Sequence, residues 1–106
     1  MLEHRMNFAE RVRQECRLQI LLGLAEASEY TATEGPLHAH LVQCGLSCSH
    51  AALRTLLAGL DESGLVVTQR AGGELGVTLA TITENGLDVA AGRSIVPGIA
   101  RPRPGS

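Results

Sequence analysis

The sequence of 106 residues predicts a mainly α-helical domain with one β-hairpin. Three observations predict this class. Leucines recur at helical spacing in residues 53–60, two segments of alternating apolar character (65–68 and 76–82) flank a turn with two glycines, and a Pro- and Gly-rich segment ends the chain. An apolar content of 44 % is sufficient for a core without disulfides. We therefore expect one domain over residues 1–93 and an extended Pro/Arg tail over residues 94–106.

The first predicted helix covers residues 7–27, which contain good helix formers and no proline. At about 100° per residue, it carries two apolar stripes on opposite sides. One stripe consists of Leu18, Leu21, Leu22 and Ala25, and the other consists of Val12, Cys16, Ile20 and Leu24. Either other elements of the same domain bury both stripes, or the second stripe pairs with another subunit. Because so short a chain has few elements to cover both sides, we expect a homodimer that uses the second stripe.

Residues 35–63 predict two helices joined by a tight turn. A Gly-Pro pair starts the first of them, and Gly45 ends it in the left-handed conformation that glycine favours. Ser47 or Ser49 caps the second helix, which runs to about Glu62. Its core stripe is Leu53, Leu56, Leu57 and Leu60.

The chain then turns directly into a hairpin and a final helix. We expect the hairpin over residues 65–82 with its tip near Gly72-Gly73, and the final helix over residues 83–92, capped by Thr83. Residues 28–34, before the paired helices, are expected to be a polar connection. Two helices with a tight turn, followed by a hairpin and another helix, are the arrangement of a winged helix-turn-helix, in which the hairpin is the wing.

These segments resemble winged-helix regulators of the ArsR and MarR type over roughly residues 18–91. The segment L-A-T-I-T-E-N-G, residues 79–86, is similar to the L-T-x-x-G pattern that follows the wing in MarR-like proteins. A closer similarity, to small Mu-like prophage proteins that are classed as ArsR-type regulators, covers Ile20–Glu26, Gly86–Arg93 and Val96–Pro104. The resemblance implies a winged-helix fold and a role in transcription regulation in a phage or prophage.

In such a fold the third helix enters the major groove of double-stranded DNA. The candidate DNA contacts are Ser47, Ser49, His50, Arg54, Thr55, Arg70, Arg101 and Arg103. In that arrangement Arg54 can pair with guanine, and the serines and threonine can bond phosphates or base edges. Arg70 lies on the wing, while Arg101 and Arg103 lie on a tail suited to phosphates or an adjacent minor groove.

The charge of this region weakens the DNA hypothesis. The formal net charge of the chain is −2, and residues 45–82 carry two arginines against three acids. Such a balance predicts weak nonspecific attraction to DNA. The alternative is a phage protein-interaction module whose third helix contacts protein and whose Arg54 is merely solvated. For Arg101 and Arg103 the alternative is a solvated tail without a partner.

Cys44, Cys48 and His50 suggest a further alternative, a metal-responsive repressor, because thiolates and imidazoles bind Zn²⁺ or Cu⁺. The ArsR-type metal sensors that the sequence resembles carry two cysteines with one residue between them, whereas three residues separate Cys44 from Cys48. Cys44 also shares the apolar side of its helix with Leu37 and Leu41, where a buried thiol acts as a small hydrophobic group. We therefore expect no metal and no cofactor.

The composition argues against several other classes of protein. With one Phe, one Tyr and no Trp, the chain lacks the aromatic platforms of RRM and OB-fold nucleic-acid binding. The sequence contains no uncharged apolar run of about 18 residues, so we expect no membrane span, and no secretory signal is visible. Three cysteines fit reduced thiols in a cytoplasm. Because no phosphate-binding loop, nucleophile elbow or zinc-protease motif is present, we expect a cytoplasmic binding protein and not an enzyme.

Overall fold

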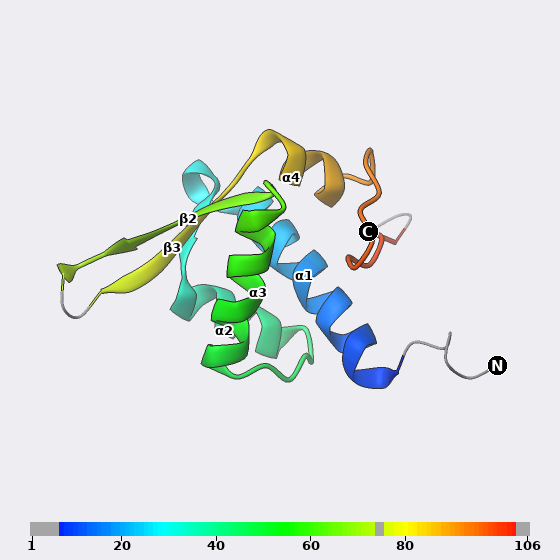
Figure 1. Ribbon diagram of the computed structural model, residues 1–106, viewed down its shortest axis with the longest axis horizontal. Helices are drawn as coiled ribbons and strands as arrows, with labels where there is room; N and C mark the ends of the chain where they lie inside the picture. Colours follow the sequence, from blue (N-terminus) through cyan, green and yellow to red (C-terminus); the bar gives the residue numbers. More distant parts are fainter. Residues whose placement is uncertain (1–6, 74–75, 104–106) are drawn as a thin grey trace.

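In this computed structural model the described residues, 7–73 and 76–103, form four α-helices and a three-stranded antiparallel sheet (Figure 1). The elements in chain order are α1 (Phe8–Glu26), the short 3-10 segment η2 (Ser28–Tyr30), β1 (Thr31–Thr33), α2 (Glu34–Gln43), α3 (His50–Glu62), β2 (Val66–Ala71), β3 (Val77–Ile82) and α4 (Glu84–Ala90). The expected mainly helical class with a β-hairpin is confirmed. Residues 1–6 of the expected domain, 74–75 of its turn and 104–106 of its tail lie outside the described residues.

Strand β1 lies where the sequence predicts a polar connection, residues 28–34. It pairs antiparallel with β3, with Thr31 opposite Thr81 and Thr33 opposite Leu79, so β3 becomes the central strand of the sheet. The hydroxyl oxygens of Thr31 and Thr81 are 2.8 Å apart across this pair. Three residues are too few to display a period of two, and the sequence pattern therefore does not reveal this strand.

Helix α3 begins after Ser49 and ends at Glu62, close to the predicted bounds. The Ser49 hydroxyl accepts a hydrogen bond from the backbone N–H of Ala52 at 3.0 Å, so Ser49 is the cap. Gly45 has a φ of +79°, the left-handed conformation that turns the chain from α2 toward α3. The four leucines of the predicted stripe, Leu53, Leu56, Leu57 and Leu60, are all buried. The opposite side of α3 is left exposed to solvent.

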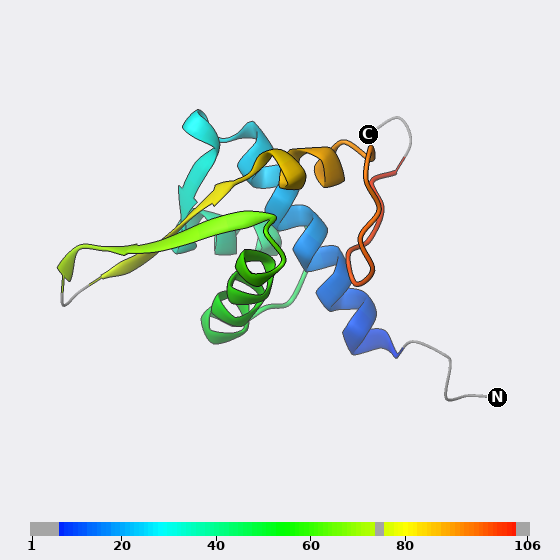
Figure 2. The same cartoon turned by 45° about the horizontal axis from the view of Figure 1, so that its top comes forward.

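Helix α1 is the central helix of the fold, and its burial corrects the expected dimer stripe. Ile20 and Leu24 are 0 % exposed and Cys16 is buried within the same chain, while Val12 is half-buried. The helix contacts α2, α3, α4 and β3, and Figure 2 shows it running between α3, α4 and the C-terminal segment. Because these elements cover both apolar stripes, Cys16, Ile20 and Leu24 are unavailable to a partner subunit. No described helix is long and apolar enough to cross a membrane.

The C-terminal segment, residues 94–103, also differs from the expected free tail. Ile99 is 9 % exposed and belongs to the core, whereas the sequence predicts an extended tail over residues 94–106. The Arg17 guanidinium donates to the carbonyl of Gly98 at 2.7 Å, and the Ala100 N–H donates to the carbonyl of Gln14 at 3.2 Å. The segment lies along α1, at the opposite end of the molecule from the hairpin (Figure 1). Ile99, the partly buried Val96 and Ala100, and these two hydrogen bonds dock the segment on α1.

Asp61 links α3 to β2. Its carboxylate accepts hydrogen bonds from the backbone N–H of Thr68, at 3.1 Å, and from the Thr68 hydroxyl. These two bonds to Thr68 hold the pKa of the Asp61 carboxyl below its ordinary value. The carboxylate therefore stabilises the fold above the unfolded-state pKa of about 3.9, and that contribution is lost as the pH falls through the lower folded-state pKa.

We expect Asp61→Ala to lower the free energy of unfolding at pH 7, and to lower it progressively less as the pH falls below about 4 and then through the lower folded-state pKa of the wild-type carboxyl. Urea denaturation of both proteins from pH 7 to pH 2.5 measures the difference. The neighbouring exposed Glu62 provides the control variant, Glu62→Ala. A difference between wild type and Asp61→Ala that stays constant over this range would contradict the proposed role of the carboxylate.

Candidate nucleic-acid interface

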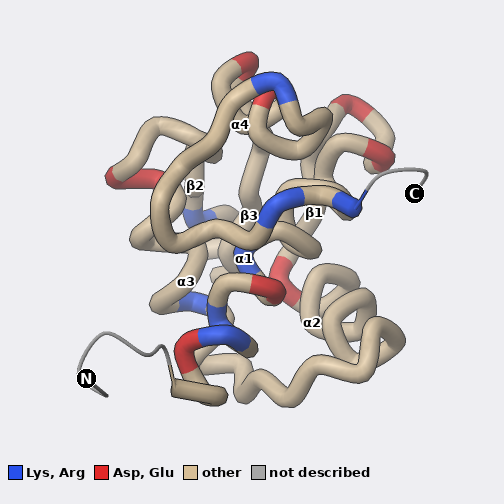
Figure 3. The backbone as a smooth tube through the Cα atoms, turned by 90° about the vertical axis from the view of Figure 1, so that its right-hand side faces the viewer, with Lys and Arg blue, Asp and Glu red and all other residues tan. Residues whose placement is uncertain are grey.

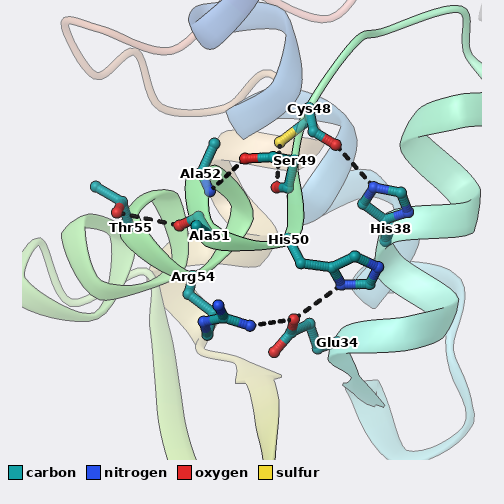
Figure 4. Close-up of polar contacts among 9 residues, drawn as sticks. All are labelled: Glu34, His38, Cys48, Ser49, His50, Ala51, Ala52, Arg54 and Thr55. Carbon is teal, nitrogen blue, oxygen red and sulfur yellow. Dashed lines mark hydrogen bonds and ion pairs between the residues drawn. The ribbon is translucent and has the colours of Figure 1, made fainter.

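The exposed side of α3 carries most of the predicted contacts. Ser49, His50, Arg54 and Thr55 are all exposed on its first two turns, and Ser47 is exposed in the turn before it. Figure 4 shows how the side chains at this end of α3 are arranged. The Ser49 hydroxyl is engaged as the helix cap, and the Thr55 hydroxyl donates to the Ala51 carbonyl at 3.2 Å. Both hydroxyls thus already have partners within α3.

Glu34, the first residue of α2, contacts two of the candidate residues of this face, Arg54 and His50. Its Oε2 accepts from Arg54 Nη1 at 2.7 Å and faces His50 Nδ1 at 2.9 Å (Figure 4). The Glu34 side chain is only 14 % exposed, whereas Arg54 and His50 are about half exposed. Arg54 is therefore neither free nor merely solvated, because a shielded carboxylate holds it against α2. Glu34 precedes Arg54 by 20 residues, and no local pattern indicates the pair.

Two imidazoles stack beside this ion pair. The ring centroids of His38 and His50 are 4.0 Å apart, and their planes are inclined by 14°. His38 Nε2 lies 2.7 Å from the backbone carbonyl oxygen of Cys48, in the turn before α3. His50 is thus held between Glu34 on one side and His38 on the other. The start of α3 is fixed against α2 by these contacts as well as by its buried leucines.

A surface groove separates α3 from the hairpin. Arg54, Leu57 and Ala58 line it from α3, Thr68, Gln69 and Arg70 line it from β2, and Thr78 lines it from β3. Arg70 is exposed, as expected of a residue on the hairpin. The structure therefore brings Arg54 and Arg70 to the same groove, although they lie on different elements. This shared groove is the main geometric support for a binding role.

The tail arginines lie elsewhere. Arg103 Nη2 is 3.7 Å from Glu15 Oε2 of α1, and Arg101 is exposed in the docked C-terminal segment. This segment lies on the far side of α1 from the hairpin (Figure 1). Seen from the tail side, acidic positions lie among the basic ones (Figure 3). The structure does not bring Arg101 and Arg103 to the groove that Arg54 and Arg70 share.

The residues of the metal hypothesis, Cys44, Cys48 and His50, each have other neighbours. The Cys44 thiol is 3.9 Å from His40 Nε2 and is exposed, not buried on the apolar side of its helix as predicted. Cys48 packs beside the buried Cys16, and His50 faces Glu34. Burial raises the pKa of the Cys16 thiol to about 11 and raises that of Cys48 as well. Within the described residues, no three His, Cys, Asp or Glu side chains are grouped to hold a metal ion.

Comparison with known proteins gives no family for this chain. No model of a known protein family matches the sequence, and no curated protein matches it significantly.

Proposed function

We propose that this protein is a winged helix-turn-helix that binds double-stranded DNA, as a transcription regulator of the ArsR or MarR type in a phage or prophage. The observation that carries the proposal is the groove shared by Arg54 of α3 and Arg70 of β2. In this function α2 and α3 are the paired helices and the β2–β3 hairpin is the wing. The role is one of binding and not of catalysis.

The buried and exposed sides of α3 support this orientation. Its leucines are fully used in the core, so its other side is free to enter a major groove. Arg70 then faces the DNA backbone beside the major groove, where a cation adds affinity for every DNA sequence alike. Arg54 lies between the exposed side of α3 and the hairpin, and it is the residue best placed to contact either a base or a phosphate.

The ion pair with Glu34 makes Arg54 a restrained contact. A phosphate or a guanine has to compete with a carboxylate whose oxygen lies 2.7 Å from the guanidinium. The Arg54 side chain is about half exposed, so DNA can compete for it. Part of the binding free energy is nevertheless lost in breaking the ion pair with Glu34. The arrangement agrees with the weak electrostatic attraction expected from the charge of residues 45–82.

Removing this restraint is expected to strengthen DNA binding. In Glu34→Gln the Arg54 guanidinium loses its anionic partner, so we expect several-fold tighter binding to a random-sequence duplex. The log–log salt dependence should steepen by about 0.9 per added phosphate contact. Arg70→Ala should instead weaken binding and make the salt dependence shallower by about the same amount. Fluorescence anisotropy of a labelled duplex over a range of salt concentrations measures both effects.

The control is Glu62→Gln, which removes the same unit of negative charge from the end of α3 without touching Arg54. The double variant Glu34→Gln/Arg54→Ala should lose the gain, because the gain depends on Arg54. Equal gains in Glu34→Gln and Glu62→Gln would show that net charge alone matters. Absence of binding by the wild-type chain at any salt concentration would overturn the DNA proposal itself.

One observation favours a second candidate, a protein-interaction module. The outermost positions of α3, Ala51, Thr55 and Ala58, are exposed and uncharged, and the Thr55 hydroxyl is bonded within its own helix. Such a face suits close packing against a helix of another protein better than it suits hydrogen bonds with bases. The anisotropy experiment separates the two candidates, because only DNA binding produces a salt-dependent signal with naked duplex.

A further inference from the structure

Two side chains on the exposed side of α3 share one carboxylate oxygen of α2. Oε2 of Glu34 lies 2.7 Å from Nη1 of Arg54 and 2.9 Å from Nδ1 of His50 (Figure 4). Because a carboxylate oxygen can only accept a hydrogen bond, the neutral imidazole of His50 carries its proton on Nδ1 and leaves Nε2 as an acceptor. The His50 side chain is about half exposed, so a proton from solvent can reach it. Protonation then takes place at Nε2 and turns His50 into a cation with two donors.

The imidazole of His38 holds the ring of His50 in this position. The two ring centroids are 4.0 Å apart. Because the carbonyl oxygen of Cys48 can only accept a hydrogen bond, His38 Nε2 donates to it at 2.7 Å. Protonating both rings would place two like charges next to each other, which is unfavourable. The stack therefore takes up one proton, and the carboxylate of Glu34 favours His50 as its site.

The charged and titratable groups that face His50 come from α2 and α3. On α2 they are Glu34 and the stacked imidazole, and on α3 it is Arg54, one helical turn further along. Arg70 of β2 lines the groove beside Arg54, and Arg13 of α1 lines a groove at the start of α3, but His50 lines neither groove. With one carboxylate and one guanidinium the cluster has no net charge, and an imidazolium gives it one positive charge.

We propose that protonation of His50 loosens the hold of Glu34 on Arg54 and strengthens DNA binding at mildly acidic pH. This regulation rests on the proposed DNA binding and acts on the same face of α3. A hydrogen bond from an imidazolium to a carboxylate is charge-assisted, so protonated His50 competes with Arg54 for the shared oxygen. The imidazolium also repels the guanidinium, and its Nε2–H becomes a donor for a phosphate oxygen. Each change favours a DNA phosphate over Glu34 as the partner of Arg54.

The coupling between the proton and DNA acts in both directions. Because a phosphate stabilises the imidazolium, DNA binding is accompanied by uptake of a proton at His50, and the two affinities change by the same factor. Histidine is the side chain whose ordinary pKa, about 6.5, allows such a change of charge between about pH 8 and about pH 5.5. The affinity for DNA is therefore lowest where His50 is neutral, and it rises by up to about tenfold per pH unit as the pH falls.

Fluorescence anisotropy of the full chain with a labelled random-sequence duplex, at constant ionic strength, tests the regulation. We expect the wild type to bind about tenfold more tightly at about pH 5.5 than at about pH 8, a usual coupling between two sites. The log–log salt dependence should steepen over the same range by about 0.9 per added phosphate contact. His50→Gln keeps a neutral side chain at every pH and should lose the gain.

The matched control is His40→Gln, because His40 also lies on α2 but its Nε2 faces Gln19 Oε1 of α1 at 3.3 Å. This variant should keep the gain. An affinity of the wild type that is the same at both pH values, or an equal loss of the gain in both variants, would overturn the regulation and leave DNA binding in place. Absence of binding at every pH would overturn the DNA proposal and with it the effect on binding.

An NMR titration without DNA tests the shared carboxylate itself. The Nε–H resonance of Arg54 should shift with the same midpoint as the ring protons of His50, and this shift should be lost in His50→Gln. Arg93, whose Nε lies 2.9 Å from Asp88 Oδ1 on α4, is the control guanidinium and should not follow that midpoint. An Arg54 resonance that stays constant while His50 titrates would overturn the proposal. Because this sample contains no DNA, failure of the regulation is measured separately from failure of the DNA proposal.

Discussion

Replacing Gly86 with alanine is expected to destabilise the protein by about 2–3 kcal/mol, in the range of overpacked cores. Gly86 lies in the first turn of α4, where its N–H donates to the Thr83 cap at 3.1 Å. A Cβ at this position would overlap the backbone carbonyl oxygen of Leu65 and lie 2.6 Å from Cγ1 of Ile82. Since the Leu65 carbonyl also accepts from the Thr83 N–H, relief of the overlap requires α4 to move away from the sheet.

Thermal unfolding measures this effect, and a loss of this size corresponds to a melting temperature lower by roughly 10–20 °C. The matched control is Gly59→Ala in α3, where an added Cβ meets nothing within 4 Å. That substitution should raise stability by up to about 1 kcal/mol, because alanine is the better helix former. If Gly86→Ala also gained stability, helix propensity would outweigh packing, and α4 would not lie so close to the sheet.

The elements with local signals were predictable from the sequence. The leucine period of 53–60 places α3 correctly because a helix of this length shows its buried side several times. Thr83 predicts the start of α4 because a side-chain cap is a contact within one turn. The alternation of β2 and β3 likewise marks the hairpin. In each case, the residues that specify the element lie within it or beside it.

The contacts between distant segments were not predictable in this way. Two apolar stripes on α1 are compatible with burial in one chain or with a dimer interface, and only the positions of α2, α3, α4 and the sheet decide between them. Glu34 meets Arg54 because α2 and α3 cross, which no spacing in the sequence expresses. Cys44 shares the helical phase of Leu37 and Leu41, yet it is exposed because it caps the C-terminal end of α2, beyond the part of the helix that packs on the core. Most residues of the candidate site could therefore be named from the sequence, but the contacts that join them could be found only from the structure.

Loss of the docked C-terminal segment is the second large effect that we expect. Truncation after Pro97 removes the buried side chain of Ile99 and the two hydrogen bonds that join Gly98 and Ala100 to α1. Ile99→Ala alone should cost about 2 kcal/mol, near the lower end for buried aliphatic side chains, and the truncation should cost more. The control is Ile95→Ala, which should change stability by less than about 0.5 kcal/mol because Ile95 is 65 % exposed. Urea denaturation measures these differences. An Ile99→Ala protein as stable as wild type would show that the segment is not docked on α1 in solution.

DNA binding provides an independent readout, because Arg101 and Arg103 lie away from the groove of Arg54 and Arg70. The truncated protein, where it remains folded, should therefore keep the salt dependence of the full chain, whereas a tail that contacts phosphates would make that dependence shallower.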